Sequence, residues 1–144
     1  MTRTLQRLAR PPRLLAFGVA TFVAGRLLDA WWHTGHDEFE TGADQIQAHW
    51  LAWLGTLLIM AAAAQGVRER RSPGYALTLA GALGYAVVAA WHYYEHTERR
   101  EVDLTHLLLV VANVVVLLGI VWVATDSRVP RRASDRSTPT AGSP

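Results

Sequence analysis

Four long apolar stretches alternate with polar segments along the chain. They cover residues 14–33, 49–67, 75–94 and 104–125. Each is close to the roughly 20 residues that an α-helix needs to cross a bilayer. With their polar ends, they predict transmembrane helices over residues 14–36, 46–67, 74–96 and 104–125. We therefore expect an all-α integral membrane protein, with a four-helix bundle in residues 1–127 and a disordered cytoplasmic tail in residues 128–144.

The distribution of arginine predicts the orientation of these helices. All 14 basic residues are arginine. Eleven of them precede the first stretch, separate the second from the third, or follow the fourth, whereas Arg99 and Arg100 join the third to the fourth. Positive charges are retained on the cytoplasmic side, so both termini are predicted to be cytoplasmic, in the plasma membrane of a prokaryote. Arginines that flank apolar spans indicate a lipid bilayer as the partner, and we expect no nucleic acid.

All six histidines lie at the predicted extracytoplasmic ends of the stretches. They are His33, His36, His49, His92, His96 and His106. Four of them, one per helix, lie about 28–30 Å from the polar residue at the other end of their helix, at 1.5 Å per residue. These four, which are predicted to lie at one height in the membrane, are His33, His49, His92 and His106. Asp29 shares a helix face with His33. Ionisable groups cannot favourably face lipid, so these side chains are predicted to point into the bundle.

The two halves of the sequence resemble each other. Residues 30–33, Ala-Trp-Trp-His, correspond to residues 89–92, Ala-Ala-Trp-His. In each half, a second histidine, an acidic segment and a histidine that opens the next helix follow. The pattern predicts two duplicated helical hairpins, related by a pseudo-twofold axis along the membrane normal. The halves are unequal, because Val88 is the counterpart of Asp29.

Arg26 lies inside the first stretch, about 18–20 Å along the helix from Arg13. A lone arginine at such a depth costs at least about 2.5 kcal/mol. We therefore predict that Arg26 pairs with Asp29, one turn above it, and contacts Asn113, which shares a helix face with His106.

The segment Asp29-Ala30-Trp31-Trp32-His33, followed by His49 and by Gly55 six residues later, resembles a metal-binding stretch of a known family. That family is the C subunit of particulate methane and ammonia monooxygenases. The resemblance implies that Asp29, His33 and His49 are copper ligands, and that His92 and His106 match the family's second histidine pair. Val88 replaces the asparagine that accompanies that pair, and the chain lacks the family's other helices and partner subunits. The resemblance thus implies a ligand set and not the hydroxylase activity.

The absence of cysteine excludes thiolate metal sites, so imidazole and carboxylate must hold any metal. We predict that Asp29, His33 and His49 bind one metal ion. A second group supplies either the remaining ligands or a second, weaker site, and it comprises His92, His96 and His106. This donor set favours copper, with zinc and iron as alternatives.

Three other functions are open to this sequence. A haem b electron carrier would use axial pairs such as His33 with His92, or His49 with His106. A di-metal oxidase would use the histidines of residues 92–96. However, Asp29 and Glu95 are the only carboxylates on the helices that are suited to bind its metals, fewer than carboxylate-rich di-iron bundles carry. A non-catalytic accessory subunit would use its histidines only to cap the bundle, beside membrane partner subunits.

Overall fold

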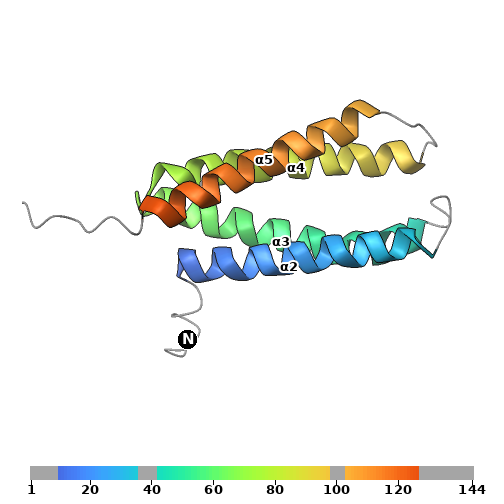
Figure 1. Ribbon diagram of the computed structural model, residues 1–144, viewed down its shortest axis with the longest axis horizontal. Coiled ribbons are helices and arrows are strands. Elements are labelled where there is room, and N and C mark those ends of the chain that lie inside the picture. Colours follow the sequence, from blue (N-terminus) through green and yellow to red (C-terminus); the bar gives the residue numbers. More distant parts are fainter. Residues whose placement is uncertain (1–9, 36–41, 98–102, 127–144) are drawn as a thin grey trace, which may run out of the picture.

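The structure, a computed structural model, describes residues 10–35, 42–97 and 103–126. The predicted tail and His36 lie outside these residues. Four helices make up almost all of the described chain: α2 (Pro11–His33), α3 (Gly42–Arg68), α4 (Pro73–Thr97) and α5 (Asp103–Asp126). They form two hairpins, α2 with α3 and α4 with α5 (Figure 1). The prediction of an all-α bundle of two helical hairpins is confirmed.

Each of the four helices is long and apolar enough to cross a membrane. Many of their large apolar side chains point outwards, among them Leu27, Val87 and Leu117, which are 67%, 70% and 57% exposed. Soluble monomers rarely expose apolar surface on this scale, whereas lipid covers it without cost. The chain is an integral membrane protein.

Glycine brings the helices of a hairpin into backbone contact. A Cβ placed on Gly25 of α2 would lie only 2.2 Å from the backbone nitrogen of Ala52 on α3. In α5, a Cβ on Gly119 would lie 2.5 Å from the backbone nitrogen of Thr78 on α4. Lipid offers no hydrophobic drive for helices to associate, so small residues that allow such close packing stabilise the pair.

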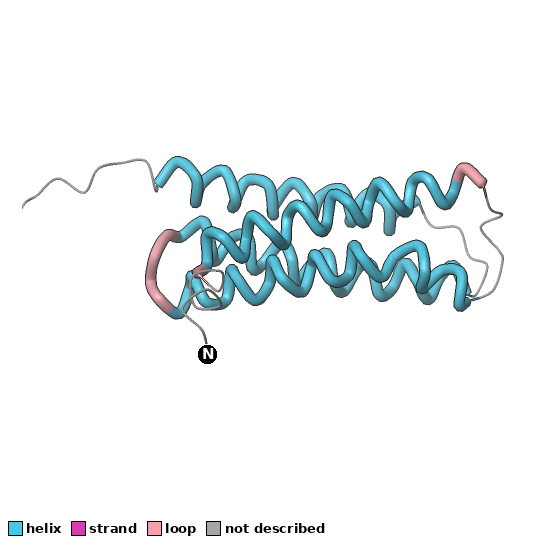
Figure 2. The backbone as a smooth tube through the Cα atoms, turned by 90° about the horizontal axis from the view of Figure 1, so that it is seen from below, coloured by secondary structure: helices cyan, strands magenta, loops and turns pink. Residues whose placement is uncertain are grey.

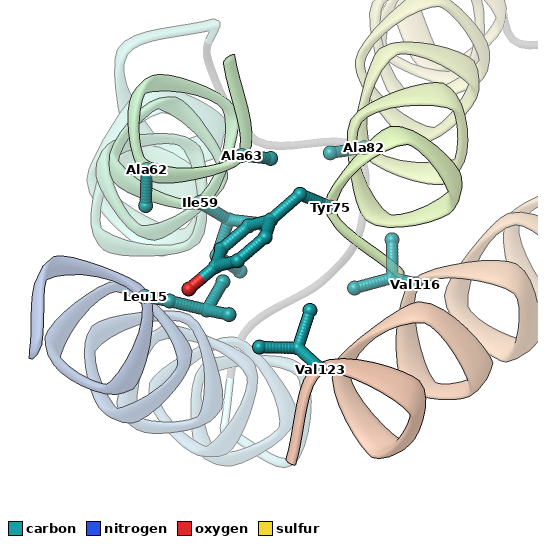
Figure 3. Packing of buried hydrophobic residues seen from close by; sticks show 8 residues of the cluster. All are labelled: Leu15, Ile59, Ala62, Ala63, Tyr75, Ala82, Val116 and Val123. Carbon is teal, nitrogen blue, oxygen red and sulfur yellow. The ribbon is translucent and has the colours of Figure 1, made fainter. Parts of the chain in front are cut away.

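The two hairpins pack against each other at the end of the bundle that holds the α3–α4 turn. The core there comprises Leu15, Ile59, Ala62, Ala63, Tyr75, Ala82, Val116 and Val123 (Figure 3). The ring of Tyr75 crosses the middle of this core and lies where a side chain on Gly66 would otherwise be. Toward the opposite end the hairpins diverge (Figure 1). The polar groups at that end are therefore positioned mainly by contacts within each hairpin.

The α3–α4 turn is short and is closed by backbone hydrogen bonds. The N–H of Arg70 donates to the carbonyl of Val67 at 2.9 Å, and the N–H of Arg71 donates to the carbonyl of Gly66 at 3.1 Å. This pair of bonds is a Schellman motif, whose middle residue adopts the left-handed conformation. Arg70 is that residue, with φ of 49°. The turn lies at one end of the elongated molecule, where Figure 2 shows it as the longer pink segment that joins two helices.

Candidate functional site

Asp29 is the buried centre of a polar cluster in the α2–α3 hairpin. Its side chain is almost fully buried. Oδ2 accepts a hydrogen bond of 2.5 Å from the guanidinium of Arg26, one turn earlier on α2. Oδ1 lies 3.0 Å from Nδ1 of His49 on α3. The predicted pairing of Arg26 with Asp29 is confirmed, and the structure adds His49 as a partner on the neighbouring helix.

The close contact of α2 with α3 explains how Asp29 reaches His49. Gly25 is one turn before Asp29, and Ala52 is three residues after His49. These two positions are in backbone contact, as described above. Because i and i+4 lie on one face of a helix, the next turn of each helix brings Asp29 and His49 together.

Arg26 also lies beside the second hairpin. About half of its side chain is exposed, and its guanidinium lies near the hydroxyl of Tyr85 on α4. The ring of Tyr85 packs edge-on against Phe22 of α2, with ring centroids 5.2 Å apart. The predicted contact of Arg26 with Asn113 is not among the interactions of the described residues, and Tyr85 takes that place. The sequence repeat indicates that these two residues occupy equivalent positions in the two halves. Arg26 lies seven residues before His33, and Tyr85 lies seven residues before His92.

The α4–α5 hairpin carries its own buried carboxylate, Glu95. Trp91 donates its indole N–H to Oε1 of Glu95 at 2.6 Å. Thr105 of α5 donates its hydroxyl to Oε2, also at 2.6 Å. Sequence reasoning named Glu95 only as one of two carboxylates on the helices and missed Thr105. The position of Thr105, directly before His106 at the start of α5, was the available sequence signal for this contact.

Two histidines of this hairpin lie in direct contact. The rings of His92 on α4 and His106 on α5 have centroids 4.5 Å apart and are inclined by 74°. Both are predicted metal ligands. The contact confirms that α4 and α5 place them at one depth, as the residue spacing indicated.

The structure thus brings the predicted ligands together in pairs, Asp29 with His49 and His92 with His106. Within the described side chains, no three histidine, aspartate or glutamate residues are close enough to hold a metal ion. His33 is the last residue of α2 and His96 lies near the end of α4, but their side chains are outside that description. The six-residue ligand set therefore stays a prediction.

Comparison with known proteins finds no match to this chain among protein-family models, curated protein sequences or solved structures.

Proposed function

We propose that this integral membrane protein binds a transition-metal ion, copper in preference to zinc, at the end of the bundle where its histidines lie. The contact that carries the proposal is the one between buried Asp29 and His49, at 3.0 Å across the α2–α3 hairpin. When Nδ1 of a neutral His49 carries its proton toward Asp29, Nε2 keeps a lone pair for a metal. Carboxylates commonly orient metal-binding imidazoles in this way.

His33 supplies the second imidazole in this proposal, since it lies on α2 one turn beyond Asp29. Arg26 binds Oδ2 of Asp29, so Oδ1 is the oxygen that turns to His49 or to the metal. The contacting pair His92 and His106 gives either further ligands or a second, weaker site. Imidazole with one carboxylate suits copper and zinc, and the Irving–Williams order favours copper. The resemblance to the monooxygenase C subunit supports the same metal.

Metal content measured by mass spectrometry, on protein purified without a histidine tag, tests this function. We expect bound copper in the wild type and its loss in His49→Ala. A matched control, Asp126→Asn, removes a carboxylate at the other end of the bundle and should keep the metal. Retention in His92→Ala would indicate two unequal sites, and loss would indicate one shared centre. If the wild type holds no more copper or zinc than an unrelated membrane protein, the histidines only cap the bundle.

We also propose that the histidine end faces the outside of the cell, with both termini in the cytoplasm. The arginine distribution supports this orientation. Because the chain has no cysteine, single cysteines can report it. A cysteine at Thr41, between α2 and α3, should react with a membrane-impermeant thiol reagent in intact cells, and one at Ser72, in the α3–α4 turn, should not. The reverse labelling would place the histidines in the cytoplasm.

A further inference from the structure

The end of the bundle opposite the candidate metal site is strongly basic. Five arginines of the described chain lie there, and two carboxylates, Glu69 and Asp126, lie at the same end. The arginines are Arg10, Arg13, Arg68, Arg70 and Arg71. All five are exposed. They come from two segments, the start of α2 and the α3–α4 turn, and the core cluster that includes Leu15 and Tyr75 holds both segments at one end of the bundle (Figure 3).

One of these arginines occupies a backbone position that is unfavourable for a residue with a side chain. Arg70 is the middle residue of the Schellman motif, and its φ of 49° lies in the left-handed region. Glycine is the usual residue there, since a Cβ in this conformation crowds the following carbonyl oxygen. A long charged side chain at a position suited to glycine is an unfavourable choice for folding alone. Strain of this kind is tolerated where the side chain has a role.

The charge of the turn is only partly neutralised from within. Arg71 donates to Glu69 at 2.5 Å, and Gln65 donates to the other carboxylate oxygen at 2.9 Å. The hydrogen bond from Arg71 lowers the pKa of Glu69 most, and the bond from Gln65 lowers it further. Glu69 is thus a carboxylate already engaged with Arg71, and the positive charges of Arg68 and Arg70 remain in excess.

The position of these arginines along the membrane normal identifies the anion they meet. The apolar spans end at Arg68 and begin at Pro11 and Pro73. The arginines therefore lie at the edge of the hydrocarbon, where the phosphates of lipid headgroups are. The planar guanidinium forms paired hydrogen bonds with phosphate oxygens.

We propose that Arg10, Arg13, Arg68 and Arg70, here called the arginine surface, bind the phosphate groups of anionic phospholipids at this end of the bundle. The site is independent of the proposed metal function. Arg70 is its specific element, and the other three arginines supply charge around it.

Native mass spectrometry of the full chain in detergent, titrated with phosphatidylglycerol or phosphatidylcholine, tests the arginine surface. The wild type should bind phosphatidylglycerol more tightly. Arg70→Gly removes one charge while suiting the turn, so it should weaken that affinity about fivefold without lowering the melting temperature. Glu69→Gln, which removes the opposing charge, should strengthen it. Arg99→Gln, a charge-matched change in the α4–α5 connection, should leave it unaltered.

Several results would overturn the proposal. These are equal affinity for the two lipids, an Arg70→Gly variant that binds phosphatidylglycerol as the wild type does, or an equal loss in Arg99→Gln. Inorganic phosphate distinguishes a soluble anion from a lipid. If millimolar phosphate raises the melting temperature as much as phosphatidylglycerol does, the surface binds a free anion and the lipid assignment is wrong.

Discussion

Replacing Gly25 by alanine tests the contact on which the Asp29–His49 pair depends. The added Cβ would lie 2.2 Å from the backbone nitrogen of Ala52, 2.6 Å from its Cα and 2.7 Å from the carbonyl carbon of Leu51. All three are backbone atoms, so no side chain can turn aside to make room. The two helices must separate, by about 1.2 Å if the nearest atom is to reach ordinary contact at 3.4 Å.

The energetic cost follows from this separation. Inserting a methyl group into a well-packed contact costs about 1–3 kcal/mol. Alanine favours the helix over glycine by about 0.5–1 kcal/mol, which offsets part of that cost. Since rigid backbone places the cost near the upper end, we expect Gly25→Ala to destabilise the protein by about 2 kcal/mol. The same separation would stretch the 3.0 Å contact of Asp29 with His49 beyond hydrogen-bonding range.

The chain provides a matched control for this experiment. A Cβ on Gly84 would meet no atom within 4 Å, so Gly84→Ala should be neutral or up to about 1 kcal/mol more stable. Unfolding by SDS in mixed micelles, followed by circular dichroism, would compare the two variants with the wild type. Metal content of the same samples would report the site. A Gly25→Ala protein as stable as Gly84→Ala would refute the close contact and the explanation of the Asp29–His49 geometry.

Two further predictions concern the buried carboxylates. Arg26→Leu should destabilise the protein by about 1–3 kcal/mol, less than for a fully buried ion pair because the Arg26 side chain is half exposed. The double variant Arg26→Leu/Asp29→Leu should recover most of this loss in SDS unfolding. A double variant as unstable as Arg26→Leu would contradict the prediction. Thr105→Val removes a hydrogen bond to buried Glu95 and should cost about 1–3 kcal/mol. Thr125→Val is the control, because the hydroxyl of Thr125 donates to the backbone carbonyl of Trp122 on an exposed face, and its loss should change stability little. Equal effects of the two changes would contradict the prediction.

The helices and much of the first polar cluster could be predicted from the sequence. Span length and arginine placement are properties of local sequence, so the predicted ends of the helices agree with those found to within a few residues. The largest difference is the start of α3, at Gly42 rather than residue 46. Arg26 and Asp29 are three residues apart on one helix, and helical geometry alone makes them neighbours.

Contacts between the hairpins were harder to predict, because they depend on how the hairpins are placed. Asn113 shares a helix face with His106, yet the residue of the other hairpin that lies near Arg26 is Tyr85. The hairpins join through the core around Tyr75 and diverge toward the histidine end (Figure 1). Side chains at equal depth on different hairpins need not meet under that arrangement. Residue depth predicts height in the membrane and does not predict the distance between helices.

The two hairpins differ in the chemistry of their buried carboxylates. Asp29 contacts a permanently charged guanidinium and an imidazole, so one of its oxygens faces a group that can bind metal. Glu95 engages both of its oxygens with neutral donors, Trp91 and Thr105. A metal ion bound by His92 and His106 would have to displace one of those hydrogen bonds to gain a carboxylate ligand. Leaving such a buried hydrogen bond unmade is costly. In a copper titration of metal-free protein we therefore expect the α2–α3 hairpin to bind copper before the α4–α5 hairpin does. Equal effects of Asp29→Asn and Glu95→Gln on the first binding step would contradict this order.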